Sequence, residues 1–330
     1  MNFDHKSLQI GTAIVISAVI LRLFSGNLPN KMAAFFSRPD VTAAMIFVET
    51  GRVVRTPQVQ ATEPAVIQET TEETQPEPVI QTPLSFTSAD AQLVQINNLC
   101  GLSVDTAKLL QQPLKWDLTQ EEPTVLILHT HGSESYAGSS DADTPYRSRQ
   151  QAKNMIAIGT ALKEKLEAAG ISVLHDCTLH DYPSYNGSYN NARKQISQYL
   201  QQYPSIKLVL DIHRDAMEDS SGKQVGTTLS VSGQTSAQLM MVVGTNAGGL
   251  NHPNWQQNMA LAVKLHAQLE KLHPGICRAI SFRKQRFNQD LSTGAMLIEV
   301  GAAGNSMDQA KTAALLLAEG IIALSHGANM

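Results

Sequence analysis

Three short apolar runs constrain the fold of this chain more than any other feature of its sequence. Residues 125–128 read VLIL, residues 208–210 read LVL and residues 295–298 read AMLI. An uninterrupted apolar run of this length is typical of a strand that is buried on both faces of a parallel sheet. Such strands need helices on both sides to cover them.

Helical and strand patterns alternate around these runs. Apolar residues recur at helical spacing in five segments, over 104–110, 148–169, 188–203, 254–273 and 306–325. Further strands are predicted over 92–99, 171–175, 225–231, 239–243 and 277–282. The sequence therefore predicts an α/β fold with a mostly parallel sheet covered by helices on both faces, in one domain over 86–330.

The N-terminal part differs from this domain. Residues 8–21 read LQIGTAIVISAVIL between Lys6 and Arg22, which is short for a full membrane span of ~20 residues unless Arg22 snorkels to the interface. We predict an uncleaved single-pass membrane anchor over 1–24, with the rest of the chain outside the cytoplasm. A cleaved signal peptide is the alternative, although the only candidate cleavage site, near 31–34, is weak.

A linker is predicted between the anchor and the domain. Residues 56–85 are acidic and rich in Pro, Thr and Gln, a composition that disfavours packing, and they follow a membrane-proximal segment over 25–55. The net charge of −4 excludes the basic surface expected of a nucleic-acid-binding protein. The three cysteines are widely spaced and indicate neither a cysteine zinc site nor a disulfide framework.

Polar side chains follow each of the three apolar runs. His129 and His131 come after the first run, Asp211 and His213 after the second, and Glu299 after the third. Ligands of open α/β sheets bind at the carboxyl ends of the strands, so we expect these side chains to meet in one crevice. Two histidines with carboxylates are the composition of a catalytic zinc site and its general base.

Zinc in catalytic sites commonly takes three protein ligands and leaves the fourth position to water. We predict His131, Glu134 and His213 as the ligands and Glu299 as the general base, which accepts a proton from the activated water.

Three further residues complete the predicted site. Asp211 or Asp215 is expected to accept the second N–H of His213 and fix its tautomer. Arg214 is a predicted catalytic residue, because a guanidinium can stabilise an oxyanion or bind a substrate carboxylate.

Several of these assignments have alternatives. His129 is an alternative ligand, because His129 and His131 would share one face of an extended backbone, and only a turn starting at Thr130 would separate them. A single histidine at a strand end more often makes a structural hydrogen bond, and Glu134 could cap the following turn. The combined pattern still favours a metal site, since an unpaired carboxylate such as Glu299 directly after an apolar run is costly.

A tyrosine-rich segment over 181–189, DYPSYNGSY, precedes the predicted helix over 188–203. Tyr182, Tyr185 and Asn186 are predicted to bind substrate, because aromatic and amide side chains combine stacking with hydrogen bonding in a sugar or peptide groove. A plain turn with aromatic anchors is the alternative.

With these residues identified, the chain resembles the stage II sporulation protein P family. Four stretches carry the resemblance in the same order: VLILHTHGSESY (125–136), HDYPSYNGSYNNAR (180–193), LVLDIHRDA (208–216) and MLIEVGAAGNS (296–306). Asn305, in the last stretch, joins the predicted substrate-binding residues.

The resemblance implies a zinc-dependent N-acetylmuramoyl-L-alanine amidase of peptidoglycan, with the fold of that enzyme group and an associated cross-link endopeptidase activity. It also implies septal wall thinning during engulfment, and a complex with the stage II sporulation proteins D and M. Related zinc amidases take a glutamate ligand from the start of the helix after the first histidine. Residues 148–151 read SRQQ here, so Glu134 has to substitute.

Two other functions fit parts of the pattern. In a zinc carboxypeptidase, His131-x-x-Glu134 and the distant His213 would hold the metal, and Arg214 would bind a terminal carboxylate. A wall-binding scaffold with a degenerate site is the non-enzymatic alternative, which the complete set of two histidines and two glutamates disfavours.

Overall fold

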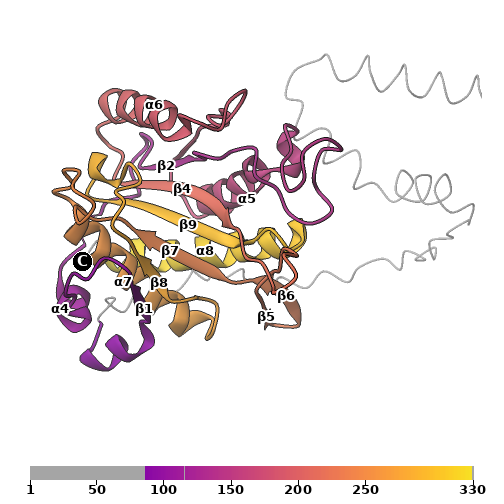
Figure 1. Cartoon of the computed structure of the whole chain (residues 1–330). Coiled ribbons are helices and arrows are strands. Elements are labelled where there is room, and N and C mark those ends of the chain that lie inside the picture. The colour runs from indigo at the N-terminus through magenta and orange to yellow at the C-terminus, as the bar shows by residue number, and fades with distance from the viewer. Residues whose placement is uncertain (1–85, 115, 329–330) are drawn as a thin grey trace, which may run out of the picture. The chain divides into compact units, whose positions relative to one another are not determined.

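A computed structural model of the chain describes residues 86–114 and 116–328 (Figure 1). The predicted anchor over 1–24, the segment over 25–55 and the linker over 56–85 all lie outside the described residues. Within the described part, no helix is both long and apolar enough to cross a membrane.

The core of the domain is a seven-stranded sheet with the strand order β1-β8-β7-β9-β4-β2-β3. Its strands are β1 (Ile96–Asn98), β2 (Val125–Leu128), β3 (Val173–His175), β4 (Leu208–Asp215), β7 (Leu239–Val243), β8 (Ile280–Phe282) and β9 (Ala295–Ala302). Every neighbouring pair is parallel except β7 and β9, which are antiparallel. The sheet therefore consists of two parallel halves that run in opposite directions, and β2, β4 and β9 belong to the same half.

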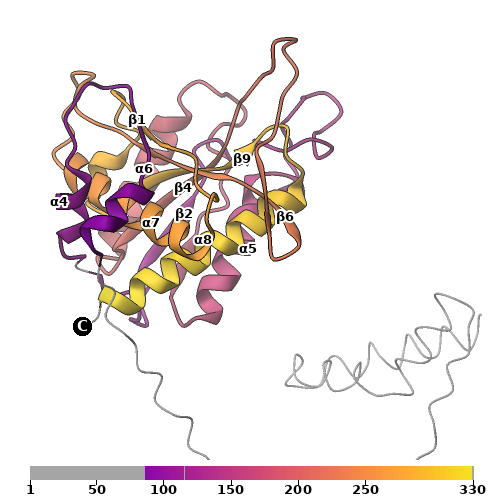
Figure 2. The ribbon, with the colours of Figure 1, turned by 90° about the horizontal axis from the view of Figure 1, so that it is seen from below.

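Helices cover both faces of this sheet, as the sequence predicts. They are α4 (Thr106–Gln111), α5 (Met155–Ala168), α6 (Ser188–Gln202), α7 (Trp255–Leu272) and α8 (Met307–Ala328). Helices α5, α7 and α8 pack on one face, which Figure 2 shows from below, and α6 lies across the other face over β2 and β4 (Figure 1). Short 3-10 helices occur at η1 (Ser88–Leu93), η2 (Gln151–Lys153) and η3 (Gln289–Leu291).

The alternation of side chains along each strand explains the two layers. Leu210 and Ile212 of β4 belong to the core under α5, α7 and α8, whereas Val209 packs with α6. Successive side chains of a strand point to opposite faces. Asp211 and His213 therefore point to the same face as Val209, which is the face that carries α6.

The structure corrects several predicted boundaries. The predicted strand over 92–99 begins inside the 3-10 helix η1, which ends at Leu93 and which the reciprocal hydrogen bonds of Thr87 and Asp90 cap, and only Ile96–Asn98 forms the strand. The predicted helix over 148–169 starts later, at Met155, because the Asn154 side chain accepts a hydrogen bond from the Ile156 N–H.

A small hairpin was missed in part. The strand β5 (Thr228–Val231) falls inside the predicted strand over 225–231, but β6 (Gln234–Ala237) was not predicted. Ser232 and Gly233 between them both have positive φ, at 50° and 80°, as the tight turn of a two-residue hairpin requires.

Candidate functional site

The candidate site lies on β4 and β9, on the face of the sheet that carries α6. His213 of β4 and Glu299 of β9 are partners in the register of these parallel strands. Both strands continue through their polar residues instead of ending before them, as β4 extends to Asp215 and β9 to Ala302. Hydrogen bonds to the neighbouring strands satisfy the backbone N–H and C=O groups of these polar segments, so the strands can continue through them.

A turn after β2 separates the two histidines of the first motif. The Glu134 N–H donates to the His131 carbonyl oxygen at 3.0 Å, which closes the turn. His129 is fully buried, and its Nδ1 lies 2.9 Å from the Ile212 carbonyl oxygen while its Nε2 lies 2.9 Å from Nε2 of His175. Burial and the neighbouring His175 lower the pKa of His129 to about 3. Both ring nitrogens of His129 therefore have partners, and this geometry favours His131 as the ligand.

His131 lies on the other side of the turn, among aromatic rings. Its imidazole stacks on the Tyr185 ring at a centroid distance of 4.3 Å, and it meets Tyr189 and His213 edge-on at 5.5 and 5.4 Å. Its buried Nδ1 has no hydrogen-bond partner within the described part of the chain. Burial, together with the charge of His213, lowers the pKa of His131 to about 4, so the ring is neutral near pH 7, which is the form that binds metal.

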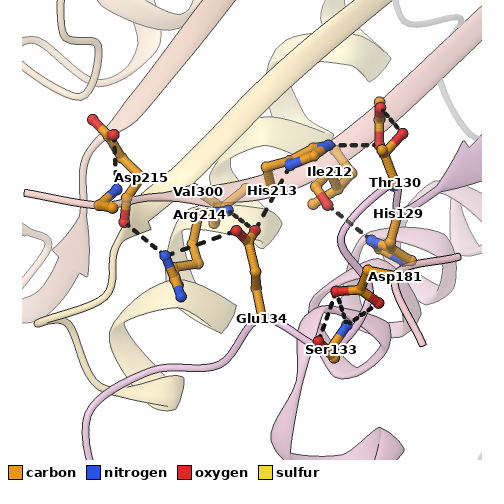
Figure 3. A network of polar contacts seen from close by, with 12 residues as sticks. His129, Thr130, Ser133, Glu134, Asp181, Ile212, His213, Arg214, Asp215 and Val300 are labelled. Carbon is orange, nitrogen blue, oxygen red and sulfur yellow. Dashed lines mark hydrogen bonds and ion pairs between the residues drawn. The ribbon is translucent and has the colours of Figure 1, made fainter. Parts of the chain in front are cut away.

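Glu134 faces His213 from the same turn (Figure 3). Its Oε2 lies 3.7 Å from His213 Nδ1, and its Oε1 lies 3.8 Å from Nη1 of Arg214. Burial raises the pKa of this carboxyl, although the Arg214 charge opposes the effect.

Asp211 connects the end of β2 to His213. Its carboxylate accepts hydrogen bonds from the Thr130 N–H at 2.8 Å and the Thr130 Oγ1–H at 2.6 Å. His213 Nε2 lies 2.8 Å from Oδ1 of Asp211, an ion-pair distance at which the ring N–H is not aligned as a hydrogen bond. Burial opposes the charge on His213, but the carboxylates of Asp211, Glu134 and Glu299 together raise the pKa of His213 to about 9.

The Glu299 carboxyl group is buried next to His213 on the neighbouring strand. Its buried Oε2 has no hydrogen-bond partner among the residues described. Burial raises the pKa of Glu299 to about 8, against the opposing charge of His213.

The residues present fit a zinc ion by their chemistry. Two imidazoles and one carboxylate are a common catalytic zinc set, and the unpartnered Nδ1 of His131 is a donor atom without another role. In the conformation described for residues 86–114 and 116–328, no three His, Cys, Asp or Glu side chains are grouped closely enough to hold a metal ion. Zinc binding by His131, Glu134 and His213 would therefore require these side chains to move closer together.

Other predicted residues have structural contacts. The buried Arg214 guanidinium donates to the carbonyl oxygens of Ser135 at 3.1 Å and Tyr146 at 3.0 Å, which anchors the loop after β2. Asp215 pairs with Arg278 at 2.7 Å, while Asp211 is the carboxylate beside His213.

Asn305 is fully buried and joins two loops. Its Oδ1 accepts from the Ala302 and Thr227 N–H groups at 2.8 and 3.2 Å, and its Nδ2 donates to the Thr227 carbonyl oxygen at 3.0 Å. These bonds give Asn305 a structural role, and substrate binding by this residue stays a prediction.

The tyrosine segment lies beside His131. Tyr182 and Tyr185 are both about half exposed, at 53% and 52%, and Asn186 is exposed. The Arg147 guanidinium lies 4.6 Å from the centre of the Tyr185 ring, whose other neighbour is His131. Tyr185 is therefore placed next to a predicted ligand and remains open to a substrate.

Sequence reasoning missed two groups of residues around the site. One is His175, whose contact with His129 depends on the pairing of β3 with β2. The other is the buried Asp181, which accepts from the Ser133 Oγ–H at 2.6 Å and pairs with Arg147 at 3.0 Å. Asp181 belongs to the tyrosine segment, but nothing in the sequence marks its partners, which lie far away in the chain.

A family model described as Stage II sporulation protein P (SpoIIP) matches residues 42–322, which is most of the chain. The chain belongs to this family. Stage II sporulation protein P of Bacillus subtilis (strain 168) is 28% identical over 210 residues, which is 59% of this chain and 49% of that protein. The match spans about half the length of that relative.

Solved amidase structures show weaker similarity. The CwlD amidase of Clostridioides difficile, solved in complex with the GerS lipoprotein, is 16% identical with a TM-score of 0.39, covering 62% of this chain and 96% of that one. The N-acetylmuramoyl-L-alanine amidase AmiC2 of Nostoc punctiforme is 14% identical with a TM-score of 0.37, covering 60% and 94%. These values are too low to carry an argument about the activity of this chain.

Proposed function

We propose that this chain is a zinc-dependent N-acetylmuramoyl-L-alanine amidase that acts on peptidoglycan during sporulation. The observation that carries the proposal is the arrangement of His131, Glu134 and His213 beside Glu299 on adjoining strands and one turn, in a member of the Stage II sporulation protein P family. The reaction is hydrolysis of the amide that joins the lactyl group of N-acetylmuramic acid to L-alanine.

His131, Glu134 and His213 would hold the zinc ion. Bound zinc would lower the pKa of a water molecule and polarise the carbonyl group of the scissile amide. Asp211 would orient His213 through the ion pair between its Oδ1 and His213 Nε2 at 2.8 Å, and two hydrogen bonds from Thr130 hold the Asp211 carboxylate in place. Carboxylate partners of this kind orient histidine ligands and increase their basicity.

Glu299 would move the proton. Its unpartnered Oε2 accepts a proton from the attacking water, whose oxygen bonds to the amide carbon. Glu299 then donates that proton to the departing nitrogen of L-alanine as the C–N bond breaks. The charge of His213 favours the ionised form of Glu299 and opposes the effect of burial on its pKa, and a zinc ion held by the three predicted ligands would act in the same direction.

The biological part of the proposal extends from the family to this chain. We propose that it contributes to septal wall thinning and engulfment, with an additional cross-link endopeptidase activity and with stage II sporulation proteins D and M as partners. An N-terminal anchor over 1–24 would hold the domain over 86–330 on the extracytoplasmic side of the membrane.

The test combines metal analysis with product mass spectrometry. The purified chain, supplied with zinc, is incubated with cross-linked peptidoglycan. We expect about one zinc ion per chain and stem peptides that bear a free L-alanine amine. Glu299→Gln should abolish turnover with zinc still bound, whereas the control Glu164→Gln, on an exposed position of α5, should retain full activity.

Two results would overturn the proposal. Release of single amino acids from stem peptides would indicate a carboxypeptidase. A chain that binds no zinc after reconstitution would indicate a wall-binding protein without this chemistry.

A further inference from the structure

A groove of about 500 Å³ opens beside the candidate zinc site. One wall is the start of α6, and the other consists of the loops over 244–250 and 283–288 that follow β7 and β8. This volume is within the range typical of ligand sites in proteins.

One side chain, Tyr189, connects the groove with the candidate site. The Tyr189 ring, which lines the groove, meets His131 at 5.5 Å on one side and Phe287 at 6.1 Å on the other. Phe287 in turn packs against a small cluster of Met240, Val242 and Leu297, and Leu297 lies two residues before Glu299 on the same face of β9. The groove and the predicted ligand His131 therefore lie on either side of the same Tyr189 ring.

The walls of the groove are held in place by hydrogen bonds. The Gly248 N–H donates to the Lys284 carbonyl oxygen at 3.0 Å, and a Cβ at Gly248 would lie only 2.7 Å from that oxygen. Asn288 Nδ2 donates to the Tyr189 carbonyl oxygen at 2.8 Å, which joins the second loop to α6. The groove is therefore formed before any ligand binds, which reduces the entropic cost of binding.

The charge of the groove is positive. Lys284 and Arg286 line it, and no acidic residue of the described chain does so. The neighbouring Asp290 is neutralised by Arg193 at 2.7 Å and by Arg286 at 3.3 Å. Lys284 is exposed and forms no ion pair with any residue that the structure describes.

The lining is otherwise apolar and aromatic. Leu250, one of the most exposed large apolar residues of the domain at 57%, lies at the groove with Tyr189 and Phe287. Exposed apolar residues beside cationic side chains match a ligand with aliphatic parts and free carboxylates.

We propose that this groove binds the stem peptide of the substrate, with Lys284 contacting a peptide carboxylate. This inference rests on the proposed amidase function for its substrate. Stem peptides carry free carboxylates, whereas an N-acetylated glycan whose lactyl group is in amide linkage has none, so the positive charge selects the peptide side of the scissile bond.

The probe is the free tripeptide L-alanyl-γ-D-glutamyl-diaminopimelate, whose binding to the whole chain is measured by calorimetry. We expect Lys284→Glu to weaken peptide binding about three- to tenfold, because a solvent-exposed charge at the edge of a binding site contributes modestly to affinity. Lys284→Met should weaken peptide binding less. Amidation of the peptide carboxylates should weaken binding to the unmodified chain by a similar factor. Lys108→Glu, which reverses an exposed lysine on α4, should leave the affinity unchanged.

Direct binding keeps this test separate from the activity test. Absence of amidase products would overturn the proposed function, but the tripeptide would still report on the groove. Equal affinity of the acidic and amidated peptides, or equal affinity of the Lys284→Glu chain and the unmodified chain, would overturn the groove assignment. Loss of affinity for a peptide-free glycan in the Lys284→Glu chain, with peptide binding intact, would also overturn it.

Discussion

Gly159 of α5 offers the sharpest test of the packing that supports the site. In a helix interior, Gly→Ala ordinarily stabilises by about 1 kcal/mol. Here the added Cβ would lie 2.5 Å from Nε2 of His175 and 2.6 Å from Nε2 of His129. Overpacking of this kind costs about 1–3 kcal/mol. Losing the partly buried His129–His175 hydrogen bond, which leaves Nε2 of the fully buried His129 without this partner, costs about another 1–3 kcal/mol. The expected net destabilisation is therefore about 1–5 kcal/mol.

The assay for Gly159→Ala is urea unfolding followed by thermal unfolding. Each kcal/mol corresponds to about 2–4 °C in a domain of this size. Displacement of His129 also disturbs its contact with the Ile212 carbonyl oxygen, next to His213, so zinc affinity should fall too. Adding His175→Ala to Gly159→Ala makes room for the methyl group and should recover part of the stability. A Gly159→Ala chain as stable as the unmodified chain would refute this account of the histidine pair.

Two further predictions concern the carboxylates of the site. Asp211→Asn removes the charge beside His213 and the carboxylate that accepts the hydrogen bonds of Thr130. The affinity for zinc, measured by competition with a chromophoric chelator, should fall about 10- to 100-fold. Unchanged affinity would contradict the role given to Asp211. In the metal-free chain, the pKa of Glu299 is raised by burial from an ordinary value of 4.5 to about 8. Its contribution to stability is therefore fully present below pH 4.5 and is lost as the pH rises through 8. Urea unfolding across this range should show the decline, and the decline should be smaller in Glu299→Gln; identical pH profiles would argue against the raised pKa.

Much of the fold followed from the apolar runs. The runs over 125–128, 208–210 and 295–298 are all buried strands of one sheet, as their composition predicted. The three strands are adjacent and parallel, so the motifs that follow the runs do meet. A continuous apolar run signals burial on both faces, and this signal is local to the strand.

The direction of the outer strands was not available from the sequence. The antiparallel pairing of β7 with β9 reverses the direction of the strands within the sheet. The loops after β7 and β8 therefore lie opposite the start of α6, where they form the groove. Strand pairing depends on contacts between segments far apart in the chain, and no local pattern encodes them.

The choice between His129 and His131 as the metal ligand also depends partly on local sequence and partly on contacts between distant segments. The sequence identified both residues and the turn that would separate them, because the spacing of side chains along a strand is a local property. Only the tertiary structure gave His129 its partners, which come from β3 and β4, and placed His131 beside His213. The sequence by itself thus identified the residues that have the chemistry for a metal site and the buried strands on which or after which they lie. Packing of distant segments decided which nitrogen atoms are free, because a buried polar atom is available only when no neighbour has already bound it.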